Sequence, residues 1–250
     1  MTVSTFLLLV LAGIGAGLVG SIVGIASLIS YPALLATGLS PVSANMTNTV
    51  ALIFQGVGSM VGSAPELRGP RQRQLVRRLA IWAVLGGIVG GVALMLTPSD
   101  AFAKIVPWLI GGSALAVLVR PSVPAGEHPP VREPVVLQLG VFLIGVYGGY
   151  FGAAAGVIML ALLLALTGET LPRSSAVRTV LLFGANGVAA LYFIAFGSVH
   201  WAAAVPLALG LLVGGRTGPV LLRRIPTEPM RIVIALTGLG LAVHLALAAY

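Results

Sequence analysis

The chain has 250 residues, of which 58% are hydrophobic and only 8% are charged. A soluble domain carries about 25% charged residues, so this composition excludes a water-soluble globule and indicates a polytopic membrane protein. The net charge of +8 does not indicate nucleic-acid binding, because the basic residues lie in short loops between apolar runs and no basic face with interleaved aromatic residues is present.

The first apolar segment, residues 5–37, is too long for one helix across a bilayer. As a straight helix it would be about 50 Å long, against a hydrocarbon core of about 30 Å. Glycine and proline interrupt it, so we expect two arms, 5–19 and 25–37, joined by a turn near Ser21.

Ordinary transmembrane spans follow this segment, and we expect them at 44–62, 79–96 and 102–119. A basic loop separates the first two of these spans and contains Arg68, Arg71, Arg73, Arg77 and Arg78. Residues 1–119 therefore form a first repeat. Residues 120–134 are read as a hydrophilic, proline-rich cytoplasmic linker.

The second half, residues 135–250, repeats this order. It begins with another over-long, glycine-broken apolar segment at 135–167. Its three spans are expected at 174–196, 200–221 and 230–249. The predicted fold is an all-α membrane protein of two repeats, each made of a glycine-broken helical hairpin and three transmembrane helices.

The glycines of the first broken segment recur in the second at one constant offset. Gly17, Gly20 and Gly24 match Gly149, Gly152 and Gly156. Apolar segments that are interrupted at corresponding places in two halves are typical of transporters built from repeats, with the binding site at the interruptions.

The distribution of arginines predicts how the two halves are oriented. With the five-arginine loop in the cytoplasm, a hairpin at 135–167 keeps the later arginines in the cytoplasm, whereas a single crossing puts them outside. These later arginines are Arg173, Arg178, Arg223 and Arg224. The hairpin satisfies the positive-inside rule. Each repeat then makes an odd number of full crossings, which inverts the second repeat relative to the first.

The chain resembles a known family of permeases over essentially its whole length. Three motifs are similar to those of the TauE/SafE family of sulfite exporters: GxxGSxxG…P…GLSPxxAxxT over Gly17–Thr47, GGYFGAAAG…LPxxxAxxT over Gly149–Thr179, and LGLLVGGRTGP over Leu209–Pro219. The resemblance implies a bacterial inner-membrane permease for small sulfur-containing anions such as sulfite or organosulfonates. Ser21 and Ala26 depart from the family pattern, because many members continue with glycine there.

The two interruptions are the first candidates for a substrate site. If each hairpin turns inside the membrane, the second arm starts there with free N–H groups and the positive end of its dipole. Two such tips facing each other would bind an anion without a cation. The candidates are Gly20, Ser21 and Gly24 in the first tip and Gly152 and Gly156 in the second. The alternative is that these glycines only allow close helix packing.

Polar side chains form a stripe on span 44–62 and on the matching span of the second half. They include Asn45, Asn48, Gln55 and Ser59 in the first, and Ser175, Thr179 and Asn186 in the second. Amides in hydrocarbon need a partner or a cavity. The stripes either face a cavity as donors to anion oxygens or make interhelical hydrogen bonds worth about 0.6 kcal/mol each. Their recurrence favours the cavity.

Two arginines are candidate substrate ligands, because a guanidinium can hold an oxyanion with a fork of donors. Arg178 lies about two turns into its helix, and Arg216 is flanked by glycines. The alternative for Arg178 is that its side chain snorkels to lipid phosphates at the cytoplasmic surface. Glu169, close to the end of the second hairpin, is expected to pair with Arg173 rather than to couple protons.

No metal or cofactor is expected. The chain has no cysteine, and its three histidines are widely separated without metal-ligand spacing. An intramembrane enzyme would need a Ser/His pair or paired acids near the glycine breaks, so we expect a permease and no enzyme. The expected partners are a small anionic substrate and membrane lipids, without nucleic acid. Alternatives are an importer, a permease for another small organic anion, or a membrane scaffold without transport. A homo-oligomer is left open.

Overall fold

The computed structural model of the chain describes residues 2–118, 134–222 and 228–249. Within these residues the chain forms eleven helices and no strand, which confirms the all-α prediction. The helices are α1 (Val3–Ile22), α2 (Ser27–Leu35), α3 (Pro41–Gly62), α4 (Ala64–Leu67), α5 (Pro70–Leu96), α6 (Ser99–Leu118), α7 (Pro134–Tyr150), α8 (Ala155–Thr167), α9 (Leu171–Phe196), α10 (Trp201–Leu222) and α11 (Glu228–Ala249). Nearly all of the predicted linker at 120–134 lies outside the described residues.

The outer surface of the helices is largely apolar. By length and composition, four of those described can cross a bilayer: α1, α5, α9, and α10 over Trp201–Leu221. α3 has 22 residues but falls short of a span because polar side chains lower its hydropathy. Large apolar side chains on the outer surface are more than half exposed, among them Leu11, Trp108, Leu139 and Phe196. Such a surface is stable in lipid and not in water.

Both over-long apolar segments break in the middle, so the single straight crossing is wrong for each. The chain leaves α1 where the N–H groups of Val23 and Gly24 both donate to the carbonyl of Val19, at 2.7 and 3.2 Å. It leaves α7 by the same pattern, with Phe151 and Gly152 donating to Tyr147 at 2.9 and 3.0 Å. Gly24 has φ +95° and Gly152 has φ +74°, conformations that glycine adopts without steric cost.

The first turn lies further along the chain than expected. Residues 23–26 form it, and Ser21 still belongs to the last turn of α1. The arms are also unequal, because α1 has 20 residues and α2 only 9, while α7 has 17 and α8 has 13. The cause is that Gly24, and not Gly20, takes the positive φ that ends the first arm.

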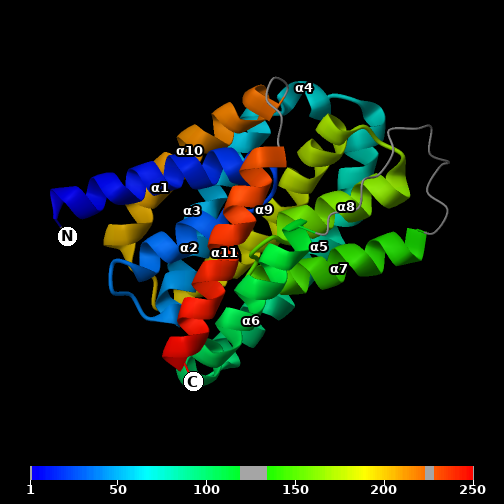
Figure 1. The fold of residues 1–250 in the computed structure, drawn as a ribbon. Helices are drawn as coiled ribbons and strands as arrows, with labels where there is room; N and C mark the ends of the chain where they lie inside the picture. The colour runs from blue at the N-terminus through cyan, green and yellow to red at the C-terminus, as the bar shows by residue number, and fades with distance from the viewer. Residues whose placement is uncertain (1, 119–133, 223–227, 250) are drawn as a thin grey trace.

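Each broken pair packs mainly on the other half of the chain. Figure 1 shows α1 and α2 extending from the centre to one side, and α7 and α8 extending to the opposite side. α1 packs on α10, and α7 packs on α5; α10 also packs on α3, and α5 on α9. α3 packs on α9, and α6 packs on α11, so these contacts join a helix of one half to a helix of the other. Each of these main contacts therefore has a counterpart between the corresponding helices of the two halves.

Glycines form the contacts between these helices, as the close-packing alternative predicts for many of them. A Cβ atom on Gly210 of α10 would lie 2.1 Å from the carbonyl oxygen of Val10 in α1. A Cβ atom on Gly86 of α5 would lie 2.2 Å from the carbonyl oxygen of Phe142 in α7. Val10 and Phe142 are separated by the same offset as the glycine motifs, so the long arms α1 and α7 are packed in matching register.

The two breaks do not follow that register. By the constant offset Gly152 corresponds to Gly20, yet Gly20 is helical within α1 while Gly152 takes a positive φ. Gly24 corresponds to Gly156, which is helical within α8. The predicted correspondence is therefore correct for helix packing and wrong for the breaks. The first break is displaced by about one helical turn.

The predicted basic loop is largely helical, because α5 already begins at Pro70 and includes most of its arginines. Arg71 Nε lies 2.8 Å from Glu169 Oε1, and Gln72 Nε2 donates to Glu169 Oε2 at 2.8 Å. Arg173 lies 3.8 Å from the same carboxylate, so the expected pairing of Glu169 is correct but Arg71 is the closer partner. The end of α8 and the start of α5 therefore lie at one end of the molecule.

Candidate functional site

The two breaks meet at the centre of the molecule, glycine against glycine. A Cβ atom on Gly24 would lie 2.6 Å from the carbonyl carbon of Gly156, and one on Gly156 would lie 2.7 Å from the Cα of Gly24. The backbone of the first break is thus in direct contact with the first turn of α8. Aromatic rings pack beside this contact, with the centroids of Tyr31 and Phe151 5.4 Å apart in an edge-on arrangement.

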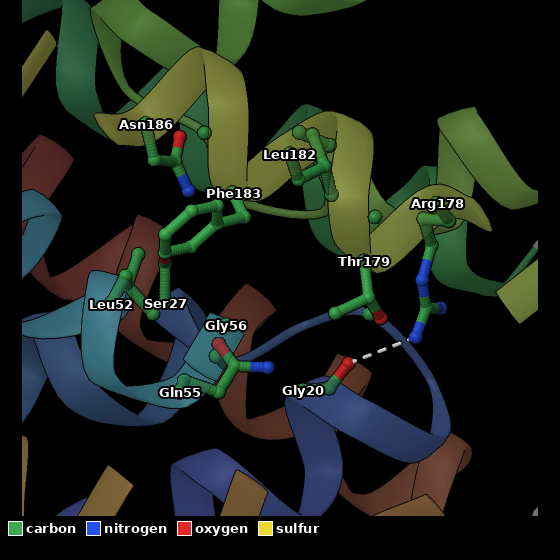
Figure 2. A pocket seen from close by; sticks show the side chains of 15 residues that line it. Gly20, Ser27, Leu52, Gln55, Gly56, Arg178, Thr179, Leu182, Phe183 and Asn186 are labelled. Atoms are coloured by element: carbon green, nitrogen blue, oxygen red, sulfur yellow. Dashed lines mark hydrogen bonds between the residues drawn. The ribbon is translucent and has the colours of Figure 1, made fainter. Parts of the chain in front are cut away.

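Arg178 of α9 lies beside this contact and is only 2% exposed. Its Nη2 donates to the carbonyl of Ser21 at 2.7 Å and to that of Gly20 at 3.3 Å, the second of which is drawn in Figure 2. Carbonyls in the last turn of a helix lack partners in that helix and carry its negative dipole end. Arg178 therefore caps the C-terminus of α1. A snorkelling role for Arg178 is wrong, because this burial is incompatible with reaching the membrane surface.

A cavity of about 60 Å³ lies between the two breaks, α3 and α9. Its backbone side is made of small residues: Gly20, Gly24 and Ala26 from the first half, and Gly152, Ala155 and Gly156 from the second. Its polar side chains are Ser27, Gln55, Arg178, Thr179 and Asn186. Its apolar part is formed by Leu52, Leu182 and Phe183, and the ring of Phe183 packs against Gly56.

Hydrogen-bond donors and a single charge characterise this cavity. Gln55 and Asn186 are half-buried and point into it from α3 and α9 (Figure 2). Among the described residues, neither amide side chain makes an intramolecular hydrogen bond. Arg178 is the only charged side chain in the lining that the structure describes, so the cavity carries positive charge and no carboxylate. Such surroundings favour an anion with oxygen acceptors.

The structure brings most of the predicted site residues together. The cavity is lined by Gly20, Gly24, Gln55, Gly152, Gly156, Arg178 and Asn186. The remaining predicted residues, Ser21, Asn45, Asn48 and Arg216, do not line it. Arg216 has an exposed side chain on the outer side of α10, and its backbone packs against Gly58 of α3.

Asn45 and Asn48 make interhelical hydrogen bonds instead, which is the alternative for the polar stripe on α3, and Ser21 of the first predicted tip also bonds to neighbouring helices. Asn45 Nδ2 donates to the carbonyl of Tyr150 at 2.8 Å and so holds the end of α7. Asn48 accepts from Ser30 at 2.6 Å and donates to the hydroxyl of Ser27 at 3.2 Å, one step behind the cavity wall. The hydroxyl of Ser21 bonds to that of Ser59 and donates to a carbonyl of α10.

The apolar part of the cavity was missed by reasoning from the sequence. A signal was nevertheless present in α9, where Thr179, Leu182, Phe183 and Asn186 are spaced i, i+3, i+4 and i+7 on one helical face. The two polar members of this series were identified as a stripe. The two apolar members between them have no contrast with an otherwise apolar helix, so composition alone does not single them out.

Comparison with known proteins places the chain among membrane transporters. The family model described as sulfite exporter TauE/SafE matches residues 9–245. The chain is 27% identical to the "probable membrane transporter protein ORF9" of Sinorhizobium over 92% of its own length and 88% of the relative. It is 28% identical to a "probable membrane transporter protein" of Haemophilus influenzae, over 82% of this chain and 80% of the relative.

A third relative is similar to the same extent. The "probable membrane transporter protein YfcA" of Escherichia coli K12 is 28% identical over 81% of this chain and 75% of its own length. No solved structure matches the chain. The relatives' names state membrane transport and no substrate, so the chemistry of the cavity has to indicate what is carried.

Proposed function

The chain belongs to the sulfite exporter TauE/SafE family of membrane transporters, and we propose that it carries small sulfur-containing anions such as sulfite or organosulfonates across the bacterial inner membrane. The observation that carries the proposal is Arg178, buried beside two helix breaks that touch each other. The substrate binds in the cavity between those breaks, with oxygen atoms toward the guanidinium and the amides of Gln55 and Asn186.

Local charge balance supports an anion as substrate. Burying a guanidinium is costly unless other groups compensate its charge. The carbonyls of Gly20 and Ser21 compensate in part, because the C-terminus of a helix is equivalent to about half a negative charge. α2 and α8 begin at Ser27 and Ala155, which both line the cavity, and the N-termini of these helices add positive potential there. An anion in the cavity completes the balance without a metal ion or a cofactor.

The two halves act as inverted repeats around this site. The contact between Arg71 and Glu169 places the end of α8 with the arginine-rich start of α5. The hydroxyl of Ser43, at the start of α3, donates to the carbonyl of Ser198 at 2.7 Å, which places that start with the uncharged turn before α10. The broken pairs thus lead to different ends of the molecule. The positive-inside rule assigns the arginine-rich end to the cytoplasm.

Thiol labelling tests this topology cleanly, because the chain contains no native cysteine. Gln74→Cys and Ser198→Cys both change exposed residues, one at each end of the molecule. In intact cells a membrane-impermeant maleimide is expected to label only the variant at Ser198. After permeabilisation both are expected to react. Labelling of both variants from the outside, or of neither, would contradict the inverted arrangement.

Efflux from proteoliposomes tests transport itself. A potential of 100 mV, negative inside, favours the exit of each negative charge by about 2.3 kcal/mol, or about 50-fold in the equilibrium concentration ratio. We expect efflux of ³⁵S-sulfite to be faster under a valinomycin-clamped potential that is negative inside, and slower when the potential is reversed. Efflux equal to that of protein-free liposomes for every anion of a sulfur-anion panel would instead favour a scaffold without transport.

A further inference from the structure

We propose that Ser113 and Tyr147 are positioning residues of the transport site, because their hydroxyls hold the second break in a strained conformation through the carbonyl of Ala153. The inference rests on the proposed function and adds to it the groups that fix one wall of the cavity. It starts from Ala154, which has φ +58° and is the only residue other than glycine with a positive φ in the described parts of the chain.

Ala154 makes the second break more strained than the first. The first break turns through Gly24, which adopts a positive φ without steric cost. An alanine in the left-handed region brings its Cβ atom too close to the following carbonyl oxygen. Such a residue persists only where its surroundings over-determine the conformation, and it is found most often at functional sites. Ala154 directly precedes α8, so its dihedral angles set the direction in which α8 begins.

Two hydroxyl groups, the hydroxyl clamp of Ser113 and Tyr147, supply the fixing contacts. The Tyr147 hydroxyl of α7 donates to the carbonyl of Ala153 at 2.7 Å, and Ser113 Oγ of α6 lies 2.8 Å from the same oxygen. The backbone carbonyl of Tyr147 also accepts the N–H groups of Phe151 and Gly152, so one residue holds the break at two points. Loss of both hydroxyls would leave a buried carbonyl without a donor, since Ala153 is 1% exposed.

The clamped peptide leads directly into the cavity wall. Ala155 and Gly156, the next residues of α8, line the cavity, and Gly156 touches the backbone of Gly24 in the first break. If Ala154 relaxed to a negative φ, the chain after it would take another direction, and both the wall and the contact between the breaks would shift. The strain of one left-handed alanine is comparable with the strength of one or two hydrogen bonds, so the hydroxyl clamp is sufficient to maintain it.

Counterflow of ³⁵S-sulfite in proteoliposomes tests the clamp. Tyr147→Phe alone is expected to raise the half-saturation concentration about threefold, and its combination with Ser113→Ala about tenfold, because a displaced α8 weakens binding. The maximal rate should change less than about threefold. Tyr150→Phe is the matched control, since it removes a hydroxyl of the same helix whose partner is Thr97 Oγ1 at 3.3 Å and not the break. It should leave the half-saturation concentration unchanged.

Ala154→Gly separates positioning from a general loss of stability. Glycine adopts φ +58° without steric cost, so the break no longer needs the hydroxyls to impose this conformation. In the doubly substituted protein, Ala154→Gly is expected to return the half-saturation concentration to within about threefold of wild type. In otherwise wild-type protein it should raise the melting temperature in detergent, whereas glycine in place of alanine within a helix lowers it.

The outcomes distinguish this inference from the proposed function. If the doubly substituted protein had the same half-saturation concentration as Tyr150→Phe, or if Ala154→Gly failed to restore it, the clamp would have no positioning role while anion transport stood. A melting temperature of Ala154→Gly below that of wild type would show that the turn carries no strain, and would overturn the inference independently of transport. No counterflow of any sulfur anion by wild-type protein would overturn the proposed function and the substrate role of the clamp with it.

Discussion

Replacing Arg178 with alanine is expected to lower the rate of anion transport by about 100-fold or more, because hydrogen bonds to charged groups contribute about 1.5–3 kcal/mol each. The substitution removes the only charge of the described cavity lining. Arg173→Ala, on the same helix and with a side chain that is 57% exposed, should transport near the wild-type rate. Initial rates of ³⁵S-anion counterflow in proteoliposomes measure the difference.

A structural effect of the same substitution has to be separated from the loss of binding. Arg178→Ala also leaves the carbonyls of Gly20 and Ser21 without their donor, so the melting temperature in detergent should fall. Arg178→Lys keeps the charge but not the planar fork, and we expect it to retain much of the stability while transport remains about tenfold reduced. Transport by Arg178→Ala as fast as by Arg173→Ala would refute a substrate role for this guanidinium.

The broken helices and Arg178 were predictable because each violates the physics of a simple membrane helix. An apolar run of about 50 Å does not fit a core of about 30 Å, so a break had to occur. Arginine inside an apolar helix needs a compensating partner or a route to the membrane surface, so its position marked Arg178 as a candidate ligand and left snorkelling as the alternative. The break required no knowledge of the neighbouring helices, which is why sequence was sufficient for it. The choice between the two interpretations of Arg178 required its burial against α1.

Which of several similar residues turns the chain or faces the cavity depends on tertiary packing and was not predictable from the sequence. Gly20 and Gly24 lie in similar apolar stretches of the sequence. Gly20 belongs to α1 and faces the side chains of Ala26 and Gln55, whereas Gly24 has a positive φ and turns the chain. Asn48 and Gln55 share one helical stripe. Ser27 and Ser30 happen to reach Asn48, and only Gln55 is left to face the cavity.

We expect the contact between the two helix breaks to be essential to both transport and stability. Gly24→Ala is expected to abolish transport and to lower the melting temperature strongly. The new methyl group would lie 2.6 Å from the backbone of Gly156, and the residue would also have to keep φ +95°. A left-handed conformation costs about 1–2 kcal/mol for a residue with a Cβ atom, and overpacking adds about 1–3 kcal/mol. The methyl group added by Gly156→Ala would lie 2.7 Å from the Cα atom of Gly24. Gly156 is helical, so this substitution carries the overlap without the cost of a positive φ.

Substitutions at two further glycines separate the cost of the positive φ from the cost of steric overlap. Gly38 has φ +85° but open space around its Cα, so Gly38→Ala carries the conformational penalty alone. Gly187 is helical within α9 with nothing within 4 Å, so Gly187→Ala should be neutral or slightly stabilising. We expect melting temperatures to fall most for Gly24→Ala, less for Gly38→Ala and not at all for Gly187→Ala. If Gly24→Ala and Gly156→Ala melted no lower than Gly187→Ala, the breaks would not be in contact, and the cavity between them would lose its structural basis.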